Sequence, residues 1–325
     1  MMKKHCDGNG MAACGRLARL FVLGGLCTAL LAGCAASPPP APAGEGEMVF
    51  CASFYPAYLA ALQIAGGVEG VRVETFLQPQ GGYLEDFRLS ELDWARAMQA
   101  DALLMMGGGL EEFLPVFFAE GGRPVLVAGE HIDRLPGRIL DPDEDTEPAP
   151  NPYTWLSPRR WARIVDGMAA GLAQLDPERA AAYIAANDAA QARIEAMQAH
   201  LAREMAPYRG RPVVVAHPAL AYLAADAGLQ VALTIERDPS IAPSAWDIAE
   251  LEALLAPHAG AVLLLEWDAP LALHGLGGLR TALCETLSVG IRDGDPSAWE
   301  RAMQANVRAL REALAQACLF SPLPL

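Results

Sequence analysis

Short apolar segments alternate with helical segments along most of this chain, and this alternation restricts the fold more than any other feature. The predicted strands are residues 48–53, 71–77, 102–106, 124–128, 212–216, 230–235, 261–266 and 287–291. The predicted helices are residues 57–66, 90–99, 158–175, 218–227, 246–257 and 297–317. Nearly continuous apolar strands that alternate with helices are typical of parallel sheets covered by helices on both faces. The sequence therefore predicts an α/β fold with two similar lobes, residues 48–175 and 207–325.

Residues 176–206 separate the two lobes and are predicted to form one long, rigid helix. Asp176 suits the N-cap position, and Pro177 suits the first turn. A stripe with helical spacing follows, made of Ile184, Asn187, Gln191, Ile194, Met197, Leu201 and Met205. At a rise of 1.5 Å per residue the helix would be about 43 Å long, which is enough to run along both lobes.

Residues 1–33 are predicted to be a signal peptide and not part of the fold. A basic stretch precedes the apolar residues 20–33, which are too few for a membrane-spanning helix of about 20 residues. Leu-Ala-Gly-Cys at 31–34 resembles a bacterial lipobox, in which Cys34 is acylated and becomes the mature N-terminus. Ordinary cleavage near Ala36 is the alternative. The Pro-rich residues 34–47 then form a tether, so we expect a lipid-anchored protein outside the cytoplasmic membrane, in the periplasm or at the cell surface.

Charge and cysteine content argue against two kinds of site. The formal net charge of −15 argues against nucleic-acid binding, which needs a basic face, and the acidic loop at 139–150 is expected to be solvated.

No cysteines have the close spacing of a thiolate zinc site. Cys284 and Cys318, both in the second lobe, are candidates for a disulfide. Two buried thiols are the alternative, and Cys51 is expected to stay free in the first strand.

A series of short motifs extends in a fixed order from about residue 48 to the end of the chain. They are Ser53–Pro56 (SFYP), Gly107–Glu111 (GGGLE), Asn151–Pro158 (NPYTWLSP), Leu175–Glu178 (LDPE), Val214–His217 (VVAH), Ala242–Ser244 (APS) with Ile248–Leu251 (IAEL), and Leu263–Glu266 (LLLE). In residue types and in order along the chain, they resemble the motifs of the zinc- and manganese-binding solute-binding proteins of ABC importers, known as cluster A-I.

This resemblance implies two α/β lobes, one rigid helix between them, and a cleft that holds a divalent metal ion. The family's metal ligands are typically three histidines and one carboxylate, and they lie in loops that follow strands, the usual ligand position in open α/β sheets. The resemblance also implies partners, an ABC permease and its ATPase, and we expect the binding protein to be a monomer.

The chain departs from the family at the expected ligand positions. Glu85 takes the place of the first histidine in an alignment without gaps, and Tyr83 and Asp86 are one slip away. Tyr153 takes the place of the second histidine, and His217 keeps the third.

The family's carboxylate ligand corresponds to Asp293, with Asp295 as a substitute. The resemblance thus implies a site made of His217, Glu85, Tyr153 and Asp293. Glu266 ends a predicted strand and faces the expected cleft, so we predict that it accepts a hydrogen bond from His217 and orients the ring.

One imidazole with three oxygen donors is a harder ligand set than zinc prefers. It suits Mn²⁺ or iron better, and a tyrosine that must lose its proton to bind favours Fe³⁺. We therefore leave the transported metal open among Mn, Fe and Zn. Because neutral imidazole is the ligand, affinity is expected to fall as the pH drops through about 6.5.

These features favour a substrate-binding lipoprotein that captures a transition-metal ion and delivers it to a permease. A second hypothesis is a relative with a degenerate metal site, which binds another ligand or serves in sensing or adhesion. A third is a metal-dependent hydrolase built on His217, Glu266 and Asp293. Because the sequence contains no GxSxG, HExxH, P-loop or GxGxxG motif, we predict that the protein is not an enzyme.

Overall fold

The computed structural model describes residues 46–75, 89–111, 114, 122–137, 149–235, 243–288 and 294–320, without the side chains of 318–320. The signal peptide, the lipobox and nearly all of the tether lie outside these residues. So does the acidic loop, apart from its last two residues. The described residues belong to one compact unit, Ala43–Leu325.

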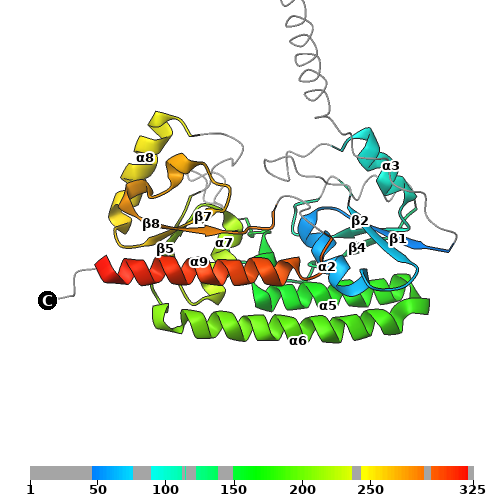
Figure 1. The fold of residues 1–325 in the computed structure, drawn as a ribbon. Coiled ribbons are helices and arrows are strands. Elements are labelled where there is room, and N and C mark those ends of the chain that lie inside the picture. Colours follow the sequence, from blue (N-terminus) through cyan, green and yellow to red (C-terminus); the bar gives the residue numbers. More distant parts are fainter. Residues whose placement is uncertain are drawn as a thin grey trace, which may run out of the picture. The chain divides into compact units, whose positions relative to one another are not determined.

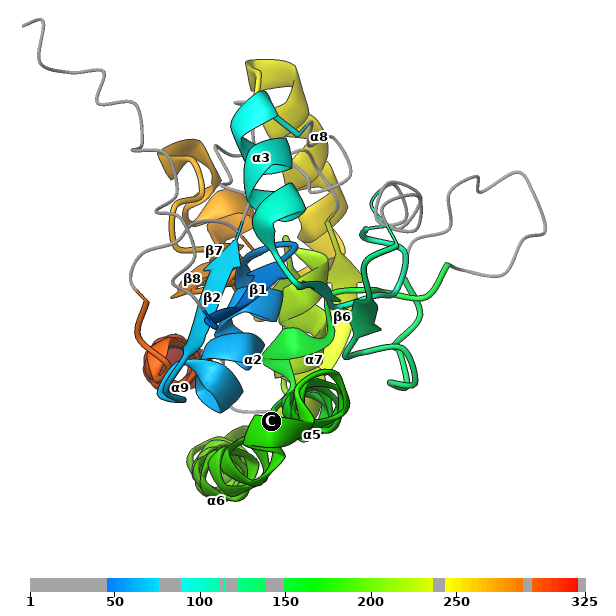
Figure 2. The same cartoon turned by 90° about the vertical axis from the view of Figure 1, so that its right-hand side faces the viewer.

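The first lobe is built on a parallel sheet of four strands. Their order is β2 (Val71–Thr75), β1 (Met48–Ala52), β3 (Ala102–Met105) and β4 (Val125–Val127). Its helices are α2 (Tyr55–Ala65), α3 (Glu91–Gln99) and α5 (Pro158–Leu175). Figure 1 and Figure 2 show α2 and α3 on opposite sides of this sheet. The central strand β3 is buried along its whole length, as expected for a strand covered on both faces.

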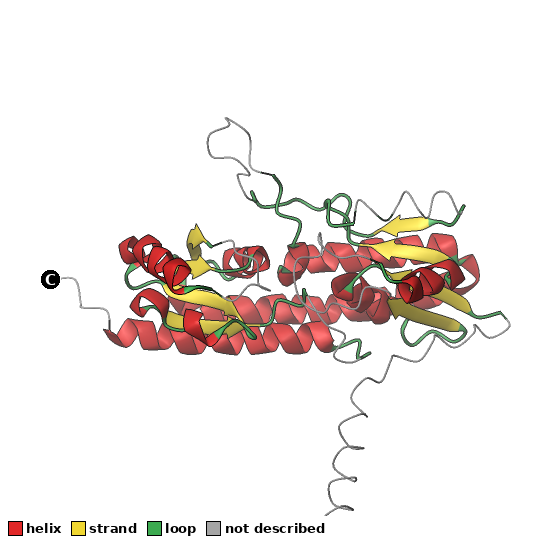
Figure 3. Cartoon of the chain, turned by 90° about the horizontal axis from the view of Figure 1, so that it is seen from above, coloured by secondary structure: helices red, strands yellow, loops and turns green. Residues whose placement is uncertain are grey.

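The second lobe repeats this plan with another parallel sheet. Its strand order is β6 (Gln230–Thr234), β5 (Pro212–Val215), β7 (Val262–Glu266) and β8 (Arg280–Cys284). Its helices are α7 (Pro218–Asp226), α8 (Ala245–Leu255) and α9 (Ala298–Phe320). Figure 3 shows helices packed along the strands of both sheets. The predicted two-lobed α/β fold with parallel sheets is confirmed.

The fourth strand of the second sheet is β8 and not the strand predicted at 287–291. Leu287 and Ser288 lie in the loop after β8, and residues 289–291 lie outside the described part of the chain. β8 is an edge strand whose residues alternate between exposed and buried. An edge strand with one solvated face lacks the continuous apolar run that marked the other strands. The apolar residues at 287–291 therefore gave a stronger but misleading signal.

The long helix is also confirmed, with a different beginning. A short 3₁₀ turn, η3 (Pro177–Arg179), precedes α6 (Ala180–Met205). Asp176 does not cap this helix. Its carboxylate accepts hydrogen bonds from Arg179 and from the Tyr183 hydroxyl, the latter at 2.7 Å. Tyr183 is therefore buried, and its neighbour Ile184, expected in the inward stripe, is 55% exposed.

The helix α6 joins the two halves by packing against both. It contacts α2 and α5 of the first lobe and α9 of the second, and Figures 1 and 2 show it side by side with α5. The remaining 3₁₀ turns are η2 (Thr154–Leu156), η4 (Ala206–Tyr208), η5 (Ala256–His258), η6 (Leu271–Leu273) and η7 (Leu276–Gly278). Among the described residues, no helix combines the length and the apolar character needed to cross a membrane.

Buried tryptophans strengthen the junction between the lobes. The Trp155 indole donates a 2.7 Å hydrogen bond to the carbonyl of Thr286, in the loop after β8. In return, the Trp299 indole at the start of α9 donates to the Trp155 carbonyl at 2.8 Å. Trp299 also stacks on Trp161 of α5, with ring centroids 5.5 Å apart. The beginning of α9 is thus fixed to the segment that precedes and opens α5.

The predicted disulfide is not formed. Cys284 is a free thiol buried at the end of β8, where it donates weakly to the Ala282 carbonyl at 3.9 Å. Burial raises the pKa of the Cys284 thiol to about 12, so it is an inert core residue. Cys318 lies in α9, but its side chain is outside the described part of the chain. Cys51 is buried in β1 and is not part of a disulfide, as expected.

Candidate metal centre

His217 lies two residues after the end of β5 and is the N-cap of α7. Its Nδ1 accepts a 3.1 Å hydrogen bond from the backbone N–H of Ala219, so the imidazole caps the helix. Pro218 occupies the first turn, where its missing N–H costs nothing. The short sequence His-Pro after an apolar strand therefore places a buried imidazole, 4% exposed, at the carboxyl edge of the second sheet.

The helix cap determines which nitrogen of His217 is protonated. Because Nδ1 accepts a hydrogen bond, a neutral ring carries its proton on Nε2. That atom lies 3.5 Å from the Ser288 hydroxyl and 3.9 Å from a Glu266 carboxylate oxygen. A metal ion at Nε2 would require the proton to move to Nδ1, and the bond from Ala219 would then be lost.

The pKa of His217 differs from the value expected from sequence. Burial lowers it to about 4, since the charged ring is poorly solvated there. The pH dependence predicted for metal affinity assumed an unshifted imidazole. With the ring neutral down to about pH 4, protons are expected to compete with a metal ion near that pH and not near 6.5.

Tyr153 lies against His217. The two rings meet edge to face with centroids 5.1 Å apart, and Tyr153 makes a similar contact with Trp155 at 5.4 Å. Tyr153 comes from the segment just before η2, and His217 comes from the second lobe. The fold therefore brings together two of the predicted ligands, although an edge-to-face contact is also the ordinary way in which aromatic rings pack.

Glu266 and Ser288 complete the surroundings of His217. Glu266 ends β7, the strand next to β5, so the carboxyl ends of both strands meet at one edge of the sheet. The distance of 3.9 Å from His217 Nε2 is too long for a direct hydrogen bond. Ser288 was not predicted as a site residue, because it fell inside the strand expected at 287–291.

The structure does not place the other predicted ligands next to His217. Glu85 and Asp293 lie outside that part of the chain. Asp295 is described, but its carboxylate accepts hydrogen bonds from Ser297 at 2.8 and 2.9 Å and contacts Arg301. Within the described ranges, no group of three or more His, Cys, Asp or Glu side chains is arranged to hold a metal ion.

Glu111 forms a second buried polar centre, at the carboxyl edge of the first sheet. It accepts hydrogen bonds from the Ser53 hydroxyl at 2.5 Å and from the backbone N–H groups of Met106 and Gly107 at 2.8 and 2.7 Å. Burial outweighs these bonds and raises the pKa of Glu111 to about 7. The carboxyl group thus ties the loop after β3 to the end of β1. In the sequence, Glu111 is visible only as the last residue of the GGGLE motif.

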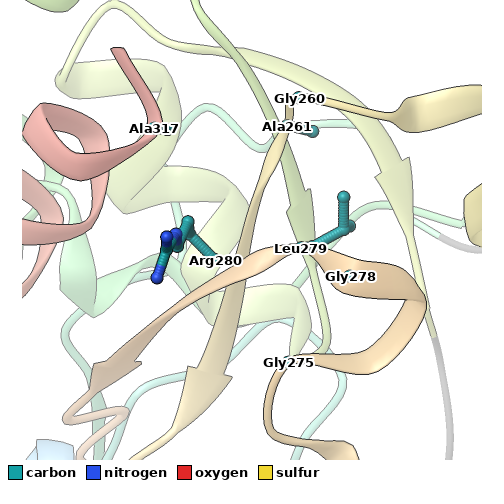
Figure 4. Close-up of a pocket in the computed structure, with 7 residues that line it drawn as sticks. All are labelled: Gly260, Ala261, Gly275, Gly278, Leu279, Arg280 and Ala317. Atoms are coloured by element: carbon teal, nitrogen blue, oxygen red, sulfur yellow. The ribbon is translucent and has the colours of Figure 1, made fainter. Parts of the chain in front are cut away.

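A surface pocket of about 520 Å³ lies at the opposite, amino edge of the second sheet. Figure 4 shows Ala261 and Leu279 beside it, together with Arg280, the first residue of β8. The rest of its lining is mainly glycine. Because it is separated from His217 and Glu266 by the length of the strands, we do not include it in the candidate centre.

Comparison with known proteins identifies the family of this fold. The family described as zinc-uptake complex component A, periplasmic, matches residues 51–313. The chain belongs to this family. The match covers both lobes and the long helix, together with Tyr153, His217 and Glu266.

Individual relatives of this zinc-uptake family are distant. The zinc-binding protein AdcA of Streptococcus pyogenes serotype M3 is 26% identical over 225 residues, which cover 64% of this chain and 43% of AdcA. The iron-binding protein YfeA of Yersinia pestis is 29% identical over 173 residues, which cover 52% of this chain and 53% of YfeA. The chain thus spans about half the length of the curated relatives that it matches.

A solved structure shows the same fold over nearly all of its length. The solute-binding protein FpvC of Pseudomonas aeruginosa, in complex with Mn²⁺, superposes with a TM-score of 0.71 and 21% sequence identity. The superposition covers 83% of this chain and 99% of FpvC. The fold is therefore that of the metal-binding solute-binding proteins.

Proposed function

We propose that the protein is the substrate-binding component of a metal ABC importer. It captures a transition-metal ion at the carboxyl edges of its two sheets and delivers the ion to a permease driven by an ATPase. The observation that carries this proposal is the contact between Tyr153 and His217 in a chain of the zinc-uptake family. An enzymatic role is not part of the proposal.

The proposed ligands are His217 and Tyr153, joined by Glu85 and Asp293 from outside the described residues. Burial keeps His217 neutral, which suits a metal ligand, and Glu266 places a carboxylate oxygen 3.9 Å from Nε2, on the side where the ion would bind. Oxygen donors outnumber nitrogen donors in this set, so the preferred cargo is Mn²⁺ or iron and not Zn²⁺. The relatives AdcA, YfeA and FpvC are described with zinc, iron and manganese respectively.

The proposed location is outside the cytoplasmic membrane, with Cys34 acylated and residues 34–47 as the tether. An anchored binding protein stays close to its permease, which raises the effective concentration of the loaded form. The domain boundaries that we propose are residues 48–175 and 207–325 for the lobes and 176–206 for the linking helix.

A degenerate metal site is the second candidate, and one observation favours it. His217 uses Nδ1 to cap α7, and this arrangement must be disrupted before Nε2 can bind an ion. In that case the protein would bind a different ligand between the lobes or would act in sensing or adhesion.

Titration of the purified mature protein with Zn²⁺, Mn²⁺ and Fe³⁺ distinguishes the two candidates. We expect one ion per protein by elemental analysis and calorimetry, with Mn²⁺ or Fe³⁺ bound more tightly than Zn²⁺. An Fe³⁺–phenolate bond would give a visible absorption band that disappears in Tyr153→Phe. Tight zinc binding that survives this substitution would contradict the proposed ligand set. If none of the three metals binds, the degenerate site is the correct interpretation.

A further inference from the structure

Asn151 is a buried amide that no motif or comparison assigns to the metal centre. It is 3% exposed and lies two residues before Tyr153. Both ends of its side chain are used. Its Nδ2 donates a 2.9 Å hydrogen bond to the Pro218 carbonyl, and its Oδ1 accepts a 3.1 Å hydrogen bond from the Tyr153 backbone N–H.

These two bonds reach the backbone on both sides of the Tyr153–His217 contact. One goes to Tyr153 itself, and the other goes to Pro218, the residue that directly follows His217. The two partners belong to different lobes and are separated along the chain by more than sixty residues. A single side chain therefore fixes the distance between the two segments that present the candidate ligands.

Tyr222 of α7 holds the backbone of Asn151 in the same place. Its hydroxyl donates a 2.5 Å hydrogen bond to the Asn151 carbonyl and accepts one of 3.0 Å from the backbone N–H of Leu135. Asn151 is thus bound to α7 twice, once through its side chain and once through its carbonyl. The helix that His217 caps is also the helix that holds Asn151.

We propose that Asn151 is a positioning residue that sets the placement of Tyr153 relative to His217. An amide suits this task because it offers a donor and an acceptor at once. Alanine would remove both of these bonds, to the Pro218 carbonyl and from the Tyr153 N–H, and would free the Tyr153 segment to move away from α7. The inference rests on the proposed function only where it concerns metal affinity, since the ring contact itself involves no metal ion.

Asn306 provides a matched control. It is also a buried asparagine with both ends of its side chain bonded, to the backbone N–H of Glu285 at 2.7 Å and to its carbonyl at 2.9 Å. Both bonding groups belong to Glu285, and within the described part of the chain Asn306 has no hydrogen bond to Tyr153 or His217. Asn306→Ala should therefore cost similar stability but should not disturb the ring contact.

The test combines a metal-free and a metal-dependent measurement. NMR of ¹³C-labelled histidine in the metal-free protein reports the ring current of Tyr153 on His217, with Tyr153→Leu as the reference for its loss. In Asn151→Ala we expect the His217 signal to move most of the way to its position in Tyr153→Leu, and in Asn306→Ala to stay in place. Affinity for Mn²⁺ should fall about 10- to 100-fold in Asn151→Ala, as for other groups that orient metal ligands.

The outcomes separate this inference from the proposed function. An unchanged His217 signal in Asn151→Ala, or an equal shift in Asn306→Ala, would overturn the positioning role whether or not metal binds. A wild-type protein that binds no Mn²⁺, Fe³⁺ or Zn²⁺ would overturn the proposed function, and the NMR comparison would still decide the role of Asn151. Should Asn151→Ala fail to fold, Tyr222→Phe removes the bond to the Asn151 carbonyl and keeps the ring. It should shift the His217 signal in the same direction, and no shift would refute the inference.

Discussion

His217 and Glu266 lie at the ends of neighbouring strands, with Nε2 of the imidazole 3.9 Å from a carboxylate oxygen. The helix cap at Nδ1 leaves the proton of the neutral ring on Nε2, on the side of Glu266. Because burial keeps His217 neutral, this is not an ion pair at neutral pH. The carboxylate instead favours a proton or a cation at Nε2, which is the expected position of a metal ion.

Glu266→Gln should therefore weaken metal binding without destroying the fold. The amide is close in size to the carboxylate but lacks its negative charge, so a cation near Nε2 would be less well stabilised. Loss of an outer-shell group beside a metal ion typically costs about 10- to 100-fold in affinity, which calorimetry with Mn²⁺ can measure. Glu204→Gln, at a partly exposed ion pair with Arg311, is the control and should bind like the wild type.

His217→Asn and His217→Ala should separate metal binding from helix capping. Both variants lose the imidazole, so both should lose stoichiometric metal binding. Asparagine is a good N-cap and can still accept a bond from the Ala219 N–H, whereas alanine cannot, and this difference is worth about 1 kcal/mol. Urea denaturation should therefore rank His217→Asn above His217→Ala in stability. Retained metal binding in either variant would exclude His217 as a required ligand.

The lobes should move little when the ligand binds. The two halves share the helix α6, which no glycine or proline interrupts, and they are also joined at Trp155 and Trp299. Hinge closure needs a few residues that can absorb large changes in backbone angle, and these connections leave little room for it. X-ray scattering curves with and without Mn²⁺ should nearly superimpose. A clear drop in the radius of gyration on binding would show that the junction bends.

Most strands and helices could be predicted because the spacing of their apolar residues matches the faces that are buried in the fold. The residues of β3 are apolar and fully buried, and α5 begins and ends where the sequence indicated. β8 was misplaced because one of its faces is solvated, so its residues alternate and give a weak signal. At the start of α6, the buried face begins at Tyr183 and not at Ile184 as predicted. The hydrogen bond from the Tyr183 hydroxyl to Asp176 turns Tyr183 inward.

The candidate centre could be predicted only in part, for a different reason. Tyr153 and His217 were found because each lies in a motif that resembles the family. Glu111 and Asn151 act through hydrogen bonds to residues far away in sequence, such as Ser53 and Pro218. No local periodicity reports such bonds, so these two residues become visible only when the sheets are assembled.

Two buried groups should give the stability of the protein opposite dependences on pH. The pKa of Glu111 is about 7 in the folded protein and 4.5 for the free group, so the folded state holds the extra proton and stability falls as the pH rises through this range. The pKa of His217 is about 4 when folded and 6.5 when free. The unfolded state then holds the extra proton, and stability falls as the pH drops from 6.5 to 4.

Each pKa shift changes the free energy of unfolding by about 3 kcal/mol over its full pH range, at 1.36 kcal/mol per pKa unit. Between pH 4.5 and 6.5 the contributions of Glu111 and His217 have opposite signs and largely cancel. Single substitutions should reveal them. Relative to the wild type, Glu111→Gln should gain free energy of unfolding as the pH rises, whereas His217→Asn should gain it as the pH falls. Urea denaturation of the wild type and each variant across this range measures the differences. Gln316→Ala removes an exposed amide of α9 and no titrating group, so its difference from the wild type should stay constant. Flat differences for Glu111→Gln and His217→Asn as well would mean that neither group is shifted by burial.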